Sequence, residues 1–507
     1  MSRNAVQIWQ AMQKAGRYVC LGLDPQTIDT LPEEALVRDA RDNVNVEETL
    51  FQFTCSLVDA VADIVGAIKP NLAFWEKYNE DGTRALRRLV LYVHQKCPWL
   101  LVIADAKRND IGNTAADYAD AIFSGYGFDA CTVNPMLGTD GIKPFTDYTD
   151  RMTILLVRTS NPSAAAQQDI EVRVPDGRTM LQYEWTAEQV ANVWNVNNNC
   201  AAVVGATVPD QMSRVRQILG DGIPILSPGF GKQGADPRAI VPAALGDGGL
   251  NIIANSSRGL MYAFKEEKYQ GLRFADATRQ ATLELHREIN TWRRYGMAKR
   301  VLVSAGALKK GHFVLKAGDH AGDYVDKDMA TMIPEETQKL AEMIAEMLDG
   351  VNLDNAVGPA YGGISLASYV AGALNKRRGL TGDDQIRALY VTKADDGSFS
   401  LRSNHAERVR GRVSVVVEDV VTTGSSASGV VGTIRETGGQ VAVVTAIWNR
   451  GGIESVDDVP LMALIVEKLP TYPAADCPLC KEGIPVNTDV GHGAKYLAEQ
   501  EAADESR

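Results

Sequence analysis

The stretch LVIADAKRNDIG, residues 101–112, has the residue types and spacing of a catalytic cluster. An apolar run ends abruptly in Asp105, Lys107 and Asp110, as a buried parallel strand does where it delivers side chains to a pocket. Alternation along a strand predicts that Asp105 and Lys107 lie on the same side, with Asp110 in the turn beyond. Grouping such charges costs desolvation, which is tolerated mainly where they do chemistry. The alternative is a solvated turn rich in polar residues.

A second candidate is VVVEDVVTTGSS, residues 415–426. An apolar strand ends in Glu418 and Asp419, and small hydroxyl residues follow at the expected start of a helix. Backbone N–H groups of small residues and a helix N-terminus suit a phosphate group. The carboxylates would instead meet hydroxyls or the water shell of a metal, so the pattern indicates a ribose 5-phosphate. The alternative is an acidic strand end followed by an ordinary Thr or Ser cap.

Eight short apolar segments must position the first cluster. Helix-length segments separate them, as right-handed strand–helix–strand units require, and eight such units favour a closed (β/α)8 barrel over an open sheet. Nearly every segment ends in polar residues, and in a barrel those ends share the face where active sites form. The expected strands are residues 18–25, 66–71, 100–107, 129–135, 153–161, 201–207, 224–231 and 250–257.

The chain is expected to hold two domains, residues 1–296 and 297–507, joined by a long helix over residues 275–296. No linker rich in Pro, Gly or Ser separates them. In the second half, the sequence pattern predicts a hairpin-rich segment at 307–328 and a helix at 334–348. Further strands and helices follow, with a polar, flexible loop after Lys393. The pattern is that of a second α/β domain.

Bulk composition narrows the class of protein. The 507 residues carry a formal net charge of −12, which argues against a general nucleic-acid binder. No apolar run is long enough for a membrane span, and the N-terminus reads as an amphipathic helix rather than a signal peptide. The seven cysteines are scattered and odd in number, which favours a reducing, cytoplasmic compartment.

The barrel half resembles orotidine 5′-phosphate decarboxylase, whose signature matches DAKRND. The resemblance rests on further motifs in order along the barrel: LGLDP, IKPN, TSNP, SPGFGKQG and NSSRG. It implies a catalytic array of alternating charge and a set of substrate-binding residues. The array is Lys69, Asp105, Lys107 and Asp110; the substrate-binding residues are Asp24, Asn71, Thr114, Ser160, Gln233 and Arg258.

That resemblance also implies a mechanism without a cofactor. Asp105 would lie against the substrate carboxylate, and Lys107 would stabilise the carbanion and protonate C6. Lys69 and Asp110 would hold Lys107 in place. Asp110 and Thr114 would reach in from a partner subunit, so a homodimer or higher homo-oligomer is expected.

The second half resembles orotate phosphoribosyltransferase, a type I phosphoribosyltransferase. The resemblance rests on residues 415–426, ALKKGHFVLKAGDHAGDYVD (307–326), GPAYGGISLA (358–367) and WNRGG (448–452). It implies Mg²⁺, orotate and phosphoribosyl diphosphate as ligands. Orotate would contact Lys316, Tyr324 and Arg450; phosphoribosyl diphosphate would contact Tyr361, Gly362, Glu418, Asp419, Thr422, Thr423, Gly424, Ser425 and Ser426.

Cations after the strand ending at Lys393 are expected to stabilise the departing diphosphate. Here the sequence departs from the better-known branch of the family, which has closely spaced Arg, Lys and His residues. Lys393 comes early, whereas Arg402, His405 and Arg408 come later. We assign Lys393, Arg402 and His405 to this catalytic role.

No firm protein metal site is expected. Mg²⁺ would be held mainly through the substrate diphosphate, with Asp419 as a possible partner through water. The segment CPLC, with Cys477 and Cys480, lacks a second Cys pair, so it is weak evidence for zinc and is interpreted as structural packing.

Together the resemblances imply a bifunctional enzyme whose second half makes OMP, the substrate of the first half. The expected partners are small molecules, with no nucleic acid and no membrane. Two alternatives remain open. The barrel could be a metal-dependent sugar-phosphate lyase or aldolase that shares the Asp-x-Lys-x-x-Asp signature. The second half could belong to a pyrimidine-sensing regulator.

Overall fold

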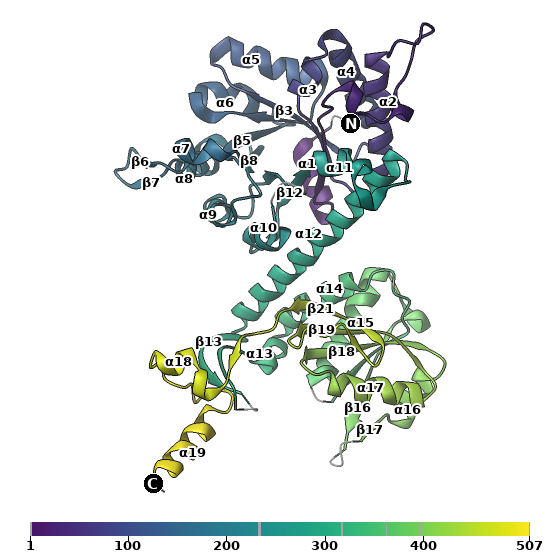
Figure 1. Cartoon of the computed structure of the whole chain (residues 1–507), viewed down its shortest axis with the longest axis vertical. Helices are drawn as coiled ribbons and strands as arrows, with labels where there is room; N and C mark the ends of the chain where they lie inside the picture. The colour runs from purple at the N-terminus through teal and green to yellow at the C-terminus, as the bar shows by residue number, and fades with distance from the viewer. Residues whose placement is uncertain (1–2, 232–234, 316–317, 361, 395–397, 506–507) are drawn as a thin grey trace. The chain divides into compact units, whose positions relative to one another are not determined.

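The computed structural model describes residues 3–231, 235–315, 318–360, 362–394 and 398–505 (Figure 1). The chain divides into two compact units, Met1–Arg293 and Arg294–Arg507. This division and the expected one at residue 296 both fall within helix α12 (Phe274–Ser304). The expectation that this helix ends at Gly296 was wrong. The following residues, MAKRVLVS, contain no helix breaker, and the chain turns only at Gly306, whose φ is 67°.

The first unit is a closed eight-stranded barrel in the order β1-β12-β9-β8-β5-β4-β3-β2, with every pair parallel. The eight strands expected from the sequence are confirmed, and β1 pairs with β12 to close the ring. Their bounds are β1 Val19–Leu23, β2 Ala67–Pro70, β3 Leu101–Arg108, β4 Ala130–Val133, β5 Met152–Arg158, β8 Cys200–Val204, β9 Ile225–Pro228 and β12 Ile252–Ser256.

Helices occupy the crossovers between these strands and surround the barrel (Figure 1). Each buries one apolar stripe against the sheet, as the 3.6-residue period requires. The main ones are α2 Val46–Val61, α4 Asn79–Lys96, α5 Gly112–Asp120, α6 Thr139–Thr146, α8 Gln182–Gln189, α9 Pro209–Leu219, α10 Pro237–Ala243 and α12. Short elements include α3 Ala73–Glu76, α11 Arg258–Met261 and the hairpin of β6 Glu171–Arg173 with β7 Thr179–Leu181.

The N-terminal helix α1 (Ala5–Lys14) covers the amino end of the barrel. Its buried residues Trp9 and Met12 pack in one core cluster with residues near the starts of several strands, including Leu101 and Met152. The Trp9 indole also donates a hydrogen bond to the side chain of Asn251. Helix α1 therefore packs at the end opposite the carboxyl ends of the strands, where barrels of this kind place their active sites.

The second unit contains a seven-stranded sheet in the order β17-β16-β15-β18-β19-β21-β20. The pairings among β16, β15, β18, β19 and β21 are parallel, and the edge strands β17 and β20 pair antiparallel. A second α/β region is thereby confirmed. The bounds are β15 Asn355–Pro359, β16 Arg387–Lys393, β17 Phe399–Ser400, β18 Val413–Val421, β19 Gln440–Asn449, β20 Ser455–Val456 and β21 Val459–Val466.

Helices cover both faces of this sheet. One core cluster joins α14 (Pro334–Met347) and α15 (Gly362–Arg378) to Val415 and Val417 of β18. A second cluster joins α17 (Ser425–Glu436) to Val416 of the same strand. Successive residues of β18 therefore enter opposite cores, which is why this strand reads as a continuous apolar run.

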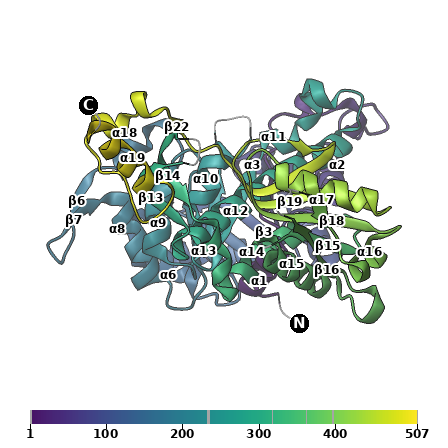
Figure 2. The same cartoon turned by 90° about the horizontal axis from the view of Figure 1, so that it is seen from below.

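A small three-stranded sheet, β13-β14-β22, completes the second unit (Figure 2). The hairpin expected over residues 307–328 is confirmed as β13 (Leu308–Val314) and β14 (His320–Val325), and β22 is Thr471–Tyr472. The short helix α13 (Lys327–Met332) follows β14. Two further helices follow β22, namely the short α18 (Pro478–Lys481) and the terminal α19 (Gly493–Glu505). Among the described residues, no helix combines the length and apolar composition that a membrane span requires.

Candidate active site

Three of the expected catalytic side chains meet at the carboxyl ends of β2 and β3. Lys69 Nζ lies 2.6 Å from Asp105 Oδ2, and Lys107 Nζ lies 2.6 Å from Asp105 Oδ1. The carboxylate is thus held between two ammonium groups. The array carries one net positive charge, which suits an anionic substrate.

The electrostatics keep both buried members charged. Burial lowers the pKa of Lys69, but attraction to Asp105 and Asp24 outweighs it and leaves that pKa above its usual value. Burial raises the pKa of Asp105, but Lys69 and Lys107 outweigh it and leave that pKa well below its usual range. At neutral pH the carboxylate and the ammonium are both ionised.

The backbone at Lys107 departs from regular strand geometry. Its φ is 49°, in the left-handed region that few non-glycine residues adopt, and the register of β3 against β4 shifts between Ala104 and Arg108. Simple alternation therefore does not describe how Lys107 meets Asp105, although the expected proximity is present. A strained residue at the centre of a charge array is a common feature of active sites.

Thr132 of β4 is a site residue that the sequence analysis missed. Its hydroxyl donates to Asp105 Oδ1 at 3.0 Å and accepts from the backbone N–H of Lys107, also at 3.0 Å. It fixes the carboxylate and the strained backbone together. The available signal was a hydroxyl residue near the end of a barrel strand, in CTVNP, which is too common to stand out.

A cavity of about 420 Å³ opens beside this array. That volume is adequate for a small ligand such as a nucleotide. Its lining joins residues expected from strands one, two, three, five and eight: Asp24, Lys69, Asp105, Ser160 and Arg258. Asn255 and Ser257 of the NSSRG motif also line it, and the sequence analysis missed Gln26 and Phe74.

Two glycines allow the cavity wall to form. A Cβ atom on Gly22 of β1 would lie 2.0 Å from Ser257 Oγ and 2.9 Å from its Cα. A Cβ atom on Gly205 would lie 2.7 Å from the Cβ of Ser160. Both serines line the cavity, so glycine at these positions is a steric requirement of the site.

Asn71 connects Asp24 to the array. Its backbone N–H donates to Asp24 Oδ1 at 3.2 Å, and its backbone forms a parallel bridge with Asp105. Its side-chain oxygen accepts from the N–H of Ala73. Asn71 therefore positions the loop after β2 through these contacts.

The remaining expected residues of the barrel site do not join the array within this chain. Asp110 accepts a hydrogen bond from the adjacent N–H of Ile111, and among the described residues it forms no ion pair with Lys69 or Lys107. Thr114 is exposed on α5. Gln233 lies outside the described residues.

The second unit has a cavity of about 520 Å³. It joins Tyr324 of β14, Thr422 after β18 and Arg450 after β19, three residues assigned from separate motifs. The backbone N–H of Arg450 donates to the carbonyl of Val421 at 2.7 Å, so the two strand ends are in direct contact. Lys468, Thr471 and His492 also line the cavity and were missed by the sequence analysis.

The acidic strand end lies next to this cavity. Glu418 and Asp419 of β18 are both buried, and Asp419 Oδ1 accepts from the N–H of Val420 at 2.6 Å. Gly424, with φ of 79°, precedes α17 and lets the chain turn into the helix. The four hydroxyl residues around this turn are exposed: Thr422, Thr423, Ser425 and Ser426.

Within the motif GPAYGGISLA, the end of β15 and the start of α15 come close together. A Cβ atom on Gly358 would lie 2.1 Å from the carbonyl oxygen of Gly363. The strand and the helix are therefore too close for a side chain at position 358. Gly362 begins α15. Tyr361 and Lys316, two expected ligand contacts, lie outside the described residues.

The expectation of a flexible loop after Lys393 was wrong for the residues that the structure describes. These form β17 and helix α16 (Ser403–Val409), and Phe399 of β17 lies against Gly429 of α17. Arg402 lies over the ring of Tyr390, and His405 meets the same ring edge-on. Lys393 lies over the ring of Phe399. Aromatic packing supplies an order that polar composition did not reveal.

Comparison with known proteins bears on the first unit. Residues 17–268 match the model of the family described as orotidine 5′-phosphate decarboxylase / HUMPS. The orotidine 5′-phosphate decarboxylase of Dechloromonas aromatica is 39% identical over 287 residues, covering 57% of this chain and 98% of the relative. That of Cellvibrio japonicus is 42% identical over 275 residues, covering 54% and 93%.

The chain belongs to the orotidine 5′-phosphate decarboxylase / HUMPS family. These matches support decarboxylation of OMP to UMP as the activity of the first unit. A solved structure of Leishmania donovani UMP synthase has 25% sequence identity and a TM-score of 0.49, and the match covers 92% of this chain and 94% of that one.

Proposed function

We propose that this protein is a bifunctional UMP synthase. The second unit converts orotate and phosphoribosyl diphosphate to OMP and diphosphate, and the first unit converts OMP to UMP and CO2. The observation that carries the decarboxylase half is the Lys69–Asp105–Lys107 array beside a nucleotide-sized cavity. The observation that supports the transferase half is the cavity that joins Tyr324, Thr422 and Arg450.

In the barrel, Asp105 lies against the carboxylate of OMP and disfavours its ground state. As CO2 leaves, the electron pair remains on C6, and the ammonium of Lys107 stabilises it and then donates a proton there. Lys69, which is buried against the other carboxylate oxygen, keeps Asp105 ionised and in place.

Remote groups bind the rest of the nucleotide. Asp24 and Asn71 contact the ribose end, and Ser160 contacts the pyrimidine. Arg258, on the exposed rim of the cavity, and Gln233 bind the phosphate. Binding energy from this non-reacting phosphate supports the chemistry at C6.

In the second unit, N1 of orotate attacks C1 of the ribose, and the bond to diphosphate breaks. Arg450 binds the orotate carboxylate through its planar guanidinium fork, and Tyr324 packs on the pyrimidine. Glu418 and Asp419 accept from the ribose hydroxyls, and the turn from Thr422 to Ser426 binds the 5′-phosphate.

Carboxylate oxygens are the ligands that Mg²⁺ prefers, so the buried Asp419 beside this turn fits a role in holding the ion through water. When bound, Mg²⁺ neutralises charge on the diphosphate leaving group. Lys393, Arg402 and His405 stabilise the departing diphosphate.

The sugar-phosphate lyase or aldolase alternative is not favoured. That chemistry uses the signature acids as metal ligands, but both oxygens of Asp105 already accept from ammonium groups here. The alternative of a pyrimidine-sensing regulator is not favoured either, because a protein without catalytic activity has no need for the Lys69–Asp105–Lys107 array of the first unit.

The test mixes the purified full chain with orotate, phosphoribosyl diphosphate and Mg²⁺ and follows orotate, OMP, UMP and CO2. We expect UMP with matching CO2. With EDTA, orotate consumption should stop, while added OMP should still be decarboxylated at the original rate. Loss of OMP decarboxylation in EDTA would favour the metal-dependent alternative. Failure to consume orotate in Mg²⁺ would refute the transferase assignment.

A further inference from the structure

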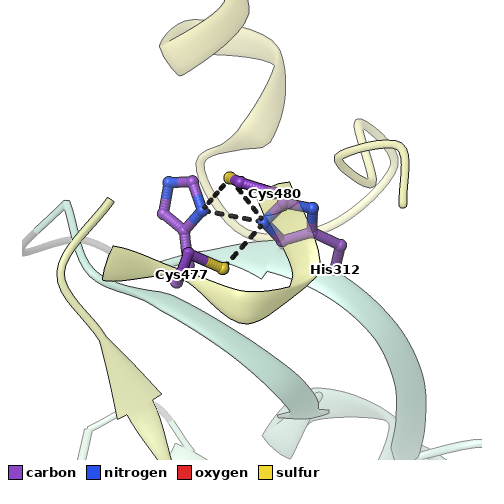
Figure 3. A group of neighbouring side chains, drawn as sticks. His312, Cys477 and Cys480 are labelled. Atoms are coloured by element: carbon purple, nitrogen blue, oxygen red, sulfur yellow. Dashed lines mark hydrogen bonds between the residues drawn. The ribbon is translucent and has the colours of Figure 1, made fainter. Parts of the chain in front are cut away.

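Four side chains with metal-binding atoms converge in the second unit, outside both proposed active sites. They are His312 of β13, His320 of β14, Cys477 and Cys480. Figure 3 labels His312 and the two cysteines. Cys477 directly precedes α18, and Cys480 lies within it, so one helical turn presents both sulfur atoms. The histidine and cysteine pairs are about 160 residues apart along the chain.

The four atoms have the size of a tetrahedral metal site. All lie within 4.8 Å of one another. The Nε2 atom of His312 lies 3.6 Å from each sulfur, and the Nδ1 atom of His320 lies 3.4 Å from Cys480 Sγ. Zinc bonds to nitrogen and sulfur in a regular tetrahedron place such donor atoms about 3.4 to 3.8 Å apart.

The two imidazole nitrogens are 2.7 Å apart. They would have to separate by about 0.6 Å to reach that geometry. The alternative is therefore a metal-free cluster in which one histidine donates a hydrogen bond to the other. A movement of this size lies within the reach of small side-chain rotations, so the spacing does not exclude a metal.

The orientation of His312 favours a metal. Its Nδ1 atom lies 2.7 Å from the carbonyl oxygen of Ile484, which can only accept a hydrogen bond, so Nδ1 carries the proton. The lone pair of Nε2 then points into the cluster. Ligating histidines in metal sites are commonly held by this kind of hydrogen bond from the second ring nitrogen to a backbone carbonyl.

Burial and ligand type select the metal. His312, His320 and Cys477 are almost completely buried, and only Cys480 is exposed. Two thiolates with two imidazoles are the ligands of structural zinc sites, and four protein ligands leave no open position for substrate. Both cysteines are free thiols in the structure.

We propose that His312, His320, Cys477 and Cys480 bind one structural Zn²⁺ ion. On binding, each cysteine loses its thiol proton to solvent, and the two thiolates balance the charge of the ion. This proposal replaces the interpretation of the CPLC segment as packing alone. The sequence motif showed only two ligands, because the other two come from a hairpin far away in the chain.

The ion would fasten the C-terminal segment to the β13–β14 hairpin. The backbone already joins them, since Asn487 donates to the carbonyl of His312 and His492 donates to that of Val314. Val314, Tyr324 and His492 also line the cavity of the second unit. Zinc would therefore hold one wall of that cavity, yet its presence does not depend on which reaction the cavity performs.

The test measures metal in the full chain, purified without a histidine tag and passed through a desalting column. Elemental analysis should find about one zinc per chain. Cys477→Ser and Cys480→Ser should each lower zinc by at least about fivefold, because each removes a ligand. The matched control is Cys97→Ser, which changes a cysteine of the first unit, outside the cluster, and should keep the wild-type zinc content.

A second measurement uses only the wild-type chain and does not depend on whether the variants fold. Zinc is removed with a chelator and replaced by Co²⁺. A tetrahedral site with thiolate ligands should show intense visible absorption and a near-ultraviolet sulfur-to-metal band, saturating at about one Co²⁺ per chain. Wild-type protein without zinc and without this spectrum would overturn the proposal. Equal loss of zinc in the Cys97→Ser control would also overturn it.

Discussion

Lys69 and Lys107 contact the two oxygens of the same carboxylate, but their surroundings give them different roles. The side chain of Lys69 is 4% exposed, whereas that of Lys107 is 49% exposed. The buried ammonium of Lys69, paired with Asp105, contributes a fixed positive charge to the site. An accessible ammonium can meet the substrate and exchange its proton with solvent after each turnover.

Replacing Lys107 by alanine should therefore separate the two activities. We expect decarboxylation to fall roughly 10³-fold or more, because the proton donor and the stabilising charge are both lost. Conversion of orotate to OMP should continue, so OMP should accumulate. Product analysis by chromatography measures both steps.

The matched control for this variant is Lys143→Ala. Lys143 is an exposed lysine of the first unit whose salt bridge to Asp147 lies within one helical turn. It should leave both rates near wild type. Near-normal release of CO2 by Lys107→Ala would refute the role given to this residue.

At the scale of elements, the barrel site depends on where strands end and how closely their ends approach. β1 and β12 pair in parallel and close the barrel, and Gly22 sits where β1 passes the backbone of Ser257. Asp24 directly follows β1, and Arg258 directly follows Ser257. The close approach of Gly22 to Ser257 therefore fixes the spacing between these two segments. Any side chain at position 22 must push them apart.

Gly22→Ala should therefore weaken both the fold and the site. We expect the free energy of unfolding of the first unit to fall by about 1–3 kcal/mol, because the new methyl group overlaps the Ser257 backbone. Urea unfolding followed by tryptophan fluorescence reports this, since all tryptophans except Trp448 lie in the first unit. Decarboxylation should decline as the segment that carries Arg258 moves.

Gly222→Ala is the control for this substitution. An added Cβ there would meet nothing within 4 Å, and the φ of Gly222 is not positive. It should leave stability and decarboxylation unchanged. Equal stability of Gly22→Ala and the wild type would show that the barrel closure tolerates a side chain at position 22.

At the scale of the whole molecule, the array in one chain is incomplete relative to the expected set of four charges. Asp110 and Thr114 lie outside it, on the turn and helix that follow β3. We propose that they complete the site of a partner subunit. This assignment makes the homodimer the catalytic unit of the first half.

Complementation tests that proposal. Lys107→Ala and Asp110→Ala chains, each inactive alone, are co-expressed with different tags and the mixed dimers are isolated. Random pairing restores one intact site in each mixed dimer, so the unseparated mixture should regain about a quarter of wild-type decarboxylation. No recovery in isolated mixed dimers would place Asp110 in the site of its own chain.

The sequence by itself determined the eight barrel strands, the residues at their carboxyl ends and the second α/β unit. These features leave local signals, because buried parallel strands are continuously apolar and their polar ends must face the site. Asp105 and Lys107 could be grouped because they end such a run, whereas Lys69 was assigned to the same array through the resemblance of IKPN to the decarboxylase family. The barrel topology brings these strand ends side by side.

Only the tertiary structure decided the left-handed backbone of Lys107, the role of Thr132 and the meeting of His312 and His320 with the CPLC segment. None of these has a local signature. A hydroxyl on a neighbouring strand and two histidines on a distant hairpin acquire their roles through contacts that chain folding creates. The physical reason is that periodicity reports which face of an element is buried, whereas a site depends on which buried faces meet.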